Sequence, residues 1–154
     1  MDIIYRQVEI VVAVQTSPYT AYRALHGEAS FPSPELNREW QVDYVSLQIL
    51  ASTGSPDFTL LFYRGVTGIG INEAQFPVAM VDLGGLRVDG IVLIISSLSI
   101  TNTGSARRVY SVTPPRRVSI SRDGGVYKFQ TFMSGAITPI VATAKFVIGL
   151  VSSG

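Results

Sequence analysis

The stretch Val45-Ser46-Leu47-Gln48-Ile49 alternates apolar and polar residues, as a β-strand with one buried face requires. A second alternating stretch, residues 57–63, places Phe58, Leu60 and Phe62 on one face. The segment between them, residues 51–56, consists mainly of the turn formers Ser, Thr, Gly and Pro. The two stretches therefore predict a β-hairpin with a long loop.

Alternation of this kind continues along most of the chain. Further strands are expected at residues 3–15, 76–83, 90–101, 107–112, 117–121, 126–132 and 140–151. Turn signals separate them, and the sharpest is Asp123-Gly124, a pair that accepts the positive φ of tight hairpin turns. The pattern predicts an all-β chain, a single jelly-roll-type antiparallel β-sandwich with about eight or nine strands and little helix. An immunoglobulin-like sandwich is the alternative.

One region, residues 17–39, shows no alternation. Residues 19–25 predict a short helix closed by Gly27, and Ser33 followed by Pro34 and Glu35 resembles a helix start. We therefore expect residues 1–38 to form an N-terminal strand with a long connection or arm, and residues 39–154 to form the sandwich. The whole is treated as one domain, which suits a chain of 154 residues.

The surface composition points to association. Charged residues make up 15% of the chain, against about 25% in an average soluble domain. Charged residues are depleted chiefly where surface is buried against a partner. The deficit favours an oligomer or a shell subunit over a monomer whose surface is rich in Ser, Thr and Gly.

The net charge and the residue types present argue against several partners and kinds of site. A net charge of +1 makes nucleic acid an unlikely partner, since binding it requires a strongly basic face. The absence of cysteine excludes disulfides, thiolate nucleophiles and Cys-ligated zinc. The first residues lack the basic region of a signal peptide, and no apolar run reaches the roughly 18 residues that span a bilayer. Contact with a membrane surface stays open.

No constellation of catalytic residues is visible. The single histidine, His26, lies in the long connection and is interpreted as a loop residue. The glycine-rich residues 65–72 lack the Lys-Ser/Thr pair and the following helix of a phosphate-binding loop. We therefore expect no enzyme, no cofactor and no metal site.

A basic stretch is the strongest candidate for a contact surface. It contains Arg107, Arg108, Arg116, Arg117 and Arg122. We expect these arginines to gather at one end or edge of the sandwich, because Pro114-Pro115 separates the two pairs. Three interpretations stay open: protection of an edge strand, pairing with carboxylates of a neighbouring subunit, and contact with a polyanion.

The aromatic residues allow a second class of function. Phe58, Phe62 and Phe129 lie on alternating strands and are expected in the core. Trp40 and Tyr63 are candidates for a ligand-facing pair that stacks on sugars.

The segments from Glu39-Trp40-Gln41-Val42 to Leu61-Phe62-Tyr63-Arg64-Gly65 resemble virion structural proteins of bacteriophages. In those proteins a Trp-led strand, a Ser/Thr-Gly-Ser turn and a strand ending in Tyr-Arg-Gly recur in small β-sandwich modules. The turn at Ser134-Gly135 and the strand after it are similar to the closing strand of such modules. The resemblance covers the chain from residue 39 onward.

The resemblance implies a capsid, decoration or tail subunit in the virion. The implied partners are other copies of the chain and other virion proteins, with residues 1–15 and 17–39 as segments that reach a neighbour. It carries over no catalytic residue. The alternative function is a phage tail or surface module that binds carbohydrate.

Overall fold

The computed structural model describes residues 3–20, 23–54, 56–64, 87–95, 100–102, 107–114, 117–120, 122 and 124–152. Within these ranges the secondary structure consists of strands and turns, with no helix. No helix in this part of the chain is therefore long and apolar enough to span a bilayer. The predicted strand at residues 76–83 lies outside the described ranges.

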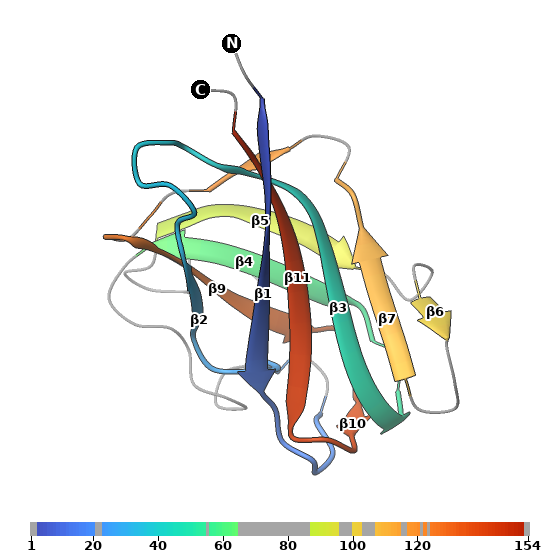
Figure 1. Ribbon diagram of the computed structural model, residues 1–154. Coiled ribbons are helices and arrows are strands. Elements are labelled where there is room, and N and C mark those ends of the chain that lie inside the picture. Colours follow the sequence, from blue (N-terminus) through green and yellow to red (C-terminus); the bar gives the residue numbers. More distant parts are fainter. Residues whose placement is uncertain are drawn as a thin grey trace.

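Eight strands form two antiparallel sheets that face each other (Figure 1). They are β1 (Ile4–Ala13), β2 (Ala29–Pro32), β3 (Gln41–Thr53), β4 (Phe58–Arg64), β5 (Arg87–Ile95), β7 (Arg107–Val112), β9 (Val126–Met133) and β11 (Thr143–Ser152). Three short strands join the larger sheet: β6 (Ile100–Asn102), β8 (Val118–Ser119) and β10 (Thr138–Pro139). The larger sheet has the order β1-β11-β3-β7-β6, with β8 and β10 also paired to β3, and the smaller has the order β2-β9-β4-β5.

The strand pairs are nested in the sequence. β1 pairs with β11, β2 with β9, β3 with β7, and β4 with β5, all antiparallel. This is one long double-stranded ribbon, and rolling it up brings β11 beside β3 and β9 beside β4. A rolled ribbon of eight strands in two sheets is the jelly roll, so the predicted fold class is confirmed and the immunoglobulin-like alternative is not adopted.

The hairpin predicted between residues 45–49 and 57–63 is wrong. β3 belongs to the seven-stranded sheet and β4 to the four-stranded one, so the connection crosses between sheets. Gly54 has φ +93° there, and a Cβ at this position would lie 2.3 Å from the carbonyl oxygen of Ala136. Only glycine fits this crossing.

The helices predicted in residues 19–25 and after Ser33 do not form in the described residues. Tyr19 and Ala24 instead make isolated bridges to Ile137 and Phe132. The Ser33 hydroxyl donates to the carbonyl of Glu35 at 3.0 Å and caps no helix. Two other differences are smaller. Strand β2 was not expected. Gly124 has the positive φ (+71°) expected of a tight turn, but it lies between β8 in one sheet and β9 in the other, so the turn forms no hairpin.

The core between the sheets is rich in aromatic rings. Phe58, Phe62 and Phe129 are at most 1% exposed, as predicted. The ring of Phe129 stacks on Phe62 at 5.5 Å and meets Phe146 edge-on at 5.3 Å. Phe146 comes from β11 and the other two from the opposite sheet, so these rings join the two layers.

Candidate assembly surface

Strand β1 forms one edge of the seven-stranded sheet. It pairs along all ten residues with β11 and with no other strand among the described residues. Its alternation sends Val8, Ile10 and Val12 toward the core, while Tyr5 and Val11 on the opposite face are 56% and 65% exposed. A long open edge bordered by exposed apolar side chains is a template for pairing with another chain.

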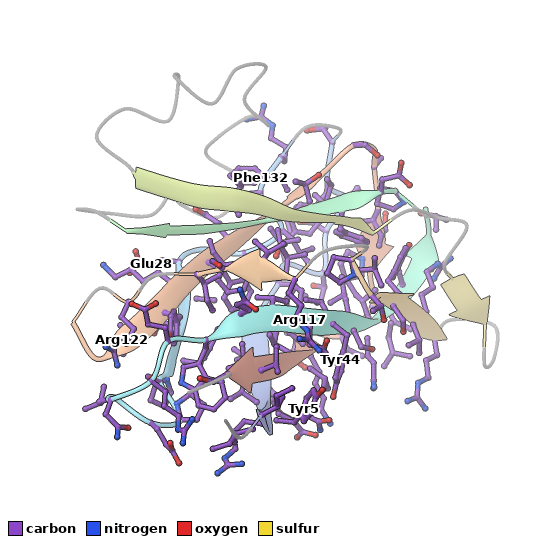
Figure 2. All side chains as sticks on the ribbon, turned by 90° about the horizontal axis from the view of Figure 1, so that it is seen from above. Tyr5, Glu28, Tyr44, Arg117, Arg122 and Phe132 are labelled. Carbon is purple, nitrogen blue, oxygen red and sulfur yellow. The ribbon has the colours of Figure 1, made fainter. Side chains whose placement is uncertain are left out.

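A side-chain contact on the outer face of this sheet spans three strands. Tyr44 of β3 stands opposite Gly149 of β11, and its hydroxyl contacts Gln7 Oε1 on β1. A Cβ at position 149 would lie 2.0 Å from the Tyr44 ring, so glycine is what lets the ring cross β11. Figure 2 shows Tyr5 and Tyr44 on the same side of the seven-stranded sheet, away from β4 and β5. The strands β1, β11 and β3 are therefore joined by side chains as well as by backbone.

An apolar groove of about 520 Å³ opens on the outer face, near the turn between β10 and β11. The side chains that define the groove are Val11, Leu50 and Val141, with exposed fractions of 65%, 37% and 40%. Arg107 and Lys145 border it, and Ile140, half exposed, is next to it in sequence. Exposed apolar residues gathered in one groove mark an interaction site in a way that scattered ones do not.

The predicted arginines do not form one cluster in the described part of the chain. Arg107 and Arg108 stand opposite Leu50 and Ile49 on β3, whereas Arg117 contacts Asp43 Oδ1 at 3.4 Å. Seven residues separate Leu50 from Asp43 on β3, or about 23 Å at the rise of an extended strand. These three residues are therefore not gathered at one end, as one form of the prediction had it, but are spread along the side of β3 that pairs with β7 and β8.

Each of the predicted arginines that the structure describes has its own partner within the chain. Arg107 Nη2 donates to Gln48 Oε1 at 3.2 Å, and Arg108 donates to the carbonyl of Ala51. Arg117 Nη2 also donates to the Tyr5 hydroxyl at 3.4 Å. Arg122 donates to the carbonyl of Leu36. Arg116 lies outside the described residues.

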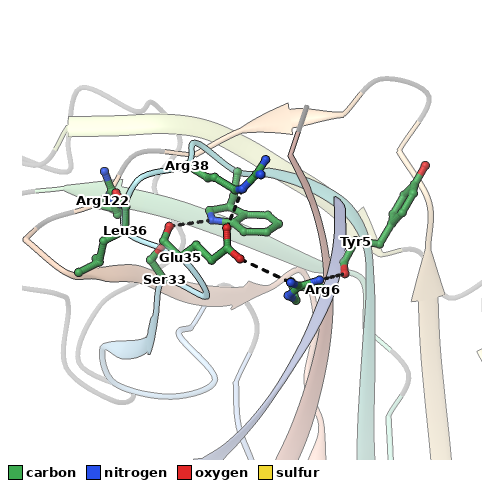
Figure 3. A network of polar contacts seen from close by, with 8 residues as sticks. Tyr5, Arg6, Ser33, Glu35, Leu36, Arg38 and Arg122 are labelled. Atoms are coloured by element: carbon green, nitrogen blue, oxygen red, sulfur yellow. Dashed lines mark hydrogen bonds and ion pairs between the residues drawn. The ribbon is translucent and has the colours of Figure 1, made fainter. Parts of the chain in front are cut away.

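A second arginine network, which the sequence did not suggest, surrounds Glu35 (Figure 3). The Glu35 carboxylate accepts from Arg38 Nε at 2.6 Å and lies 3.5 Å from Arg6 Nη2. Its carbonyl accepts from the indole of Trp40 at 3.3 Å. The network ties the loop before β3 to the start of β1.

The candidate ligand-facing aromatics are not presented together. Trp40 is 0% exposed, and its ring belongs to the core. The backbone of Tyr63 lies in β4, and its side chain is outside the described part of the structure. The Trp40 indole thus offers no face to a sugar.

His26 lies outside the strands, as expected for a loop residue, but its side chain is buried. Nδ1 of His26 lies 2.5 Å from the carbonyl oxygen of Gly27, and Nε2 lies 2.8 Å from Thr131 Oγ1. These two contacts fit a neutral imidazole that donates from Nδ1 and accepts at Nε2. Phe129 and Phe146 meet the ring edge-on. Burial lowers the pKa of His26 from 6.5 to about 4, partly opposed by the bond to Gly27.

The described residues assemble no metal centre. No group of three His, Asp or Glu side chains there could hold an ion. A polar cleft of about 510 Å³ opens where β11 ends, and Glu39, Arg122 and Tyr127 are among its lining residues. Burial raises the pKa of Tyr127 above its ordinary value.

No protein-family model matches the chain, and no curated protein matches it in sequence. Solved structures to which the chain is similar include the Bacillus endospore appendages, which are disulfide-linked pili, at 14% identity over 98% of this chain and 88% of the other, with a TM-score of 0.28. Tomato aspermy virus is similar at 12% identity over 97% and 78%, with a TM-score of 0.38. The decameric BFDV capsid protein is similar at 12% identity over 99% and 97%, with a TM-score of 0.28.

Proposed function

We propose that this chain is a structural subunit of a virus particle, a capsid or capsid-associated protein that acts by self-association and not by catalysis. Other virion proteins are its further partners, and the virion is its location. The resemblance of residues 39 onward to bacteriophage virion proteins makes a bacteriophage the proposed source.

The observation that carries the proposal is the apolar groove of Val11, Leu50 and Val141 on the outer face of the seven-stranded sheet. A monomer gains nothing from exposing these side chains, whereas a neighbouring subunit that covers them gains about 25 cal/mol per Å² of apolar surface buried. The low charged content of 15% supports the same conclusion. Viral capsid domains commonly adopt the jelly roll, a fold that they share with lectins.

The carbohydrate-binding alternative is not supported by the described residues. The residues expected to face a sugar in that alternative were Trp40 and Tyr63. Trp40 is fully buried, and no other exposed aromatic pair in the described residues replaces it.

Light scattering after size-exclusion chromatography, over a range of concentrations, tests self-association. We expect a mass that rises with concentration, and closed particles by negative-stain electron microscopy. Leu50→Glu and Val141→Glu place a carboxylate in the groove, beside Arg107 and Lys145. Each is expected to shift the chain toward monomer, because the desolvation cost of burying this charge at an interface exceeds the gain from pairing it.

Leu36→Glu is the matched control. Leu36 is 63% exposed but lies outside the groove, so this variant is expected to assemble like the original chain. A chain that stays monomeric at every concentration contradicts the proposal. Equal effects of the Leu36 and Leu50 variants contradict the role of the groove.

A further inference from the structure

The backbone of β1 directs its hydrogen-bonding groups alternately toward β11 and toward the open side. The N–H of Val14 donates to the carbonyl of Ala142 at 3.0 Å, and these residues continue the β1–β11 register as an opposed pair. In an antiparallel ladder both backbone groups of one residue face one neighbour, and those of the next residue face the other way. Even-numbered residues of β1 therefore face β11, and odd-numbered residues face the open side.

Two hydrogen bonds at the ends of the strand agree with this assignment. The N–H of Gln15 donates to the Tyr19 hydroxyl at 3.0 Å, and the carbonyl of Tyr5 accepts from Arg6 Nη1 at 3.0 Å. Both backbone groups belong to odd-numbered residues, and neither partner lies on β11. The open edge is thus closed at each end by a side chain of the same molecule.

The middle of the edge has no such cover. The backbone N–H and C=O groups of Gln7, Glu9 and Val11 point to the open side, where no strand in the described part of the chain pairs with them. A groove of about 320 Å³, lined by residues 10–13 and 26–30, lies beside the C-terminal half of β1. An incoming strand can therefore reach these groups.

We propose that this edge binds β1 of a second copy, so that the two strands run antiparallel about a two-fold axis and the seven-stranded sheets of both copies become continuous. This interface rests on the self-association proposed above and is one of the contacts through which the copies would associate. A two-fold axis suits an edge strand, because antiparallel pairing presents the same surface from both copies.

Charge restricts where the axis can lie. In antiparallel strands opposed side chains share a face, so the axis passes between the two copies of one residue. An axis at Arg6 opposes two guanidinium groups, and an axis at Glu9 opposes two carboxylates. Like charges directly opposite each other destabilise a sheet. Near the middle of the strand, Gln7, Val8 and Ile10 avoid such pairs. An axis at Ile10 opposes the apolar Val11 to the Glu9 carboxylate. Gln7 and Val8 are therefore the proposed positions for the axis.

Both positions also cover exposed apolar side chains. With the axis at Gln7, Val11 of one copy lies opposite Ile3 of the other, and Ile3 is 54% exposed in the monomer. With the axis at Val8, Val11 lies opposite Tyr5, which is 56% exposed. In each register the exposed Val11 gains an apolar partner, which stabilises a cross-strand pair.

Because the chain contains no cysteine, single cysteine variants report the contact directly. Opposed residues of a hydrogen-bonded pair have Cα atoms about 5.5 Å apart, within the span of a disulfide. Under diamide, Gln7→Cys is expected to form a covalent dimer if the axis lies at Gln7. A mixture of Gln7→Cys and Glu9→Cys is expected to form the mixed dimer if the axis lies at Val8. Ser111→Cys, exposed on β7 of the same sheet, is the control.

Cross-linking that exceeds the Ser111 control in either arrangement supports the interface and selects its register. No excess in both arrangements, with folding verified by the fluorescence of the single tryptophan, overturns it. Particles that assemble without any such cross-link leave the proposed function standing and remove only this interface. A cross-linked dimer that never forms a larger assembly supports the interface and contradicts the shell role.

Discussion

The imidazole of His26 joins the two sheets through a hydrogen bond and two aromatic contacts, and it does so in the neutral form. Thr131 Oγ1 approaches Nε2, while the carbonyl of Gly27 accepts from Nδ1. In a protonated ring both nitrogens donate, and the Thr131 hydroxyl could reorient to accept from Nε2, so the hydrogen bond would be kept. The positive charge, however, would lie against the rings of Phe129 and Phe146. Burial of the charge, and not loss of a hydrogen bond, is what lowers the pKa.

This lowered pKa makes the stability depend on pH. Above pH 6.5 His26 is neutral in both the folded and the unfolded chain and contributes no pH dependence. Between pH 6.5 and about 4 only the unfolded chain takes up the proton, so the free energy of unfolding falls, by about 3 kcal/mol in total. Urea unfolding at a series of pH values, followed by tryptophan fluorescence, measures this fall.

His26→Gln is the control, because it keeps polar groups at this position and removes the titration. The difference in unfolding free energy between the original chain and the variant is expected to shrink by about 3 kcal/mol from pH 7 to pH 4. Carboxylates titrate in both proteins and cancel in that difference. A difference that stays constant with pH contradicts a buried neutral histidine.

At the level of single residues, the stability of the fold also depends on the close approach of the Tyr44 ring to Gly149. Gly149→Ala places a methyl group in the Tyr44 ring, which must swing away and give up its contact with Gln7. We expect the free energy of unfolding to fall by about 1–3 kcal/mol, a typical cost of overpacking.

The double variant separates this clash from other effects of the methyl group. With Tyr44→Ala already present, Gly149→Ala is expected to cost about 1 kcal/mol less than in the original chain. Chemical denaturation of all four proteins completes the cycle. Additive effects of the two substitutions would show that the ring does not lie over Gly149.

At the scale of the element, the alternation of β1 decides where proline is tolerated. Glu9 is odd-numbered, so Glu9→Pro removes an N–H that faces the open side, together with an exposed ion pair to Lys145. Val8→Pro removes an N–H from the β1–β11 ladder and is expected to destabilise the chain by about 3 kcal/mol more. Thermal unfolding by circular dichroism compares the two.

Val8→Ala accounts for the apolar packing that Val8→Pro also loses. Subtracting its effect leaves the cost of the lost ladder bond. Equal costs for proline at positions 8 and 9, after this correction, would contradict the assignment of even-numbered residues to β11.

The strands themselves were largely predictable at this scale. Residues 107–112 coincide with β7, and residues 126–132 differ from β9 by one position. Alternation is a local property, because successive side chains of a strand point to opposite faces whatever lies beside the strand. β2 has only four residues, too few for the alternation to stand out, and its environment in the sheet defines it as a strand.

At the scale of the whole molecule, the nested pairing places β1 and β2 at corresponding edges of the two sheets. The outermost pair of the ribbon, β1 with β11, joins the two ends of the chain, and β1 begins where β11 ends (Figure 1). Among the described strands the ribbon closes no barrel, so its outermost strand has one side that no described strand pairs with. The edge proposed to bind a second copy is therefore a consequence of the topology and not of any motif in β1.

The candidate surface was less predictable than the fold. The charge deficit indicated association, but Arg107 and Arg117, ten positions apart in the sequence, lie about 23 Å apart along β3. Val11, Leu50 and Val141 come from three distant segments, and no sequence signal links them before the sheet forms. Glu35 likewise meets Arg6 only because the loop before β3 returns to the start of β1.

The sequence by itself determined the all-β class, the position of most strands, the jelly-roll-type sandwich and the core role of Phe58, Phe62 and Phe129. These follow from alternation and turn residues, which act over a few neighbouring positions. The tertiary structure alone decided that residues 45–49 and 57–63 belong to different sheets, that Trp40 and His26 are buried, and which edge stays open. Those outcomes depend on how the ribbon rolls, which brings together residues a hundred positions apart, as His26 and Thr131 show.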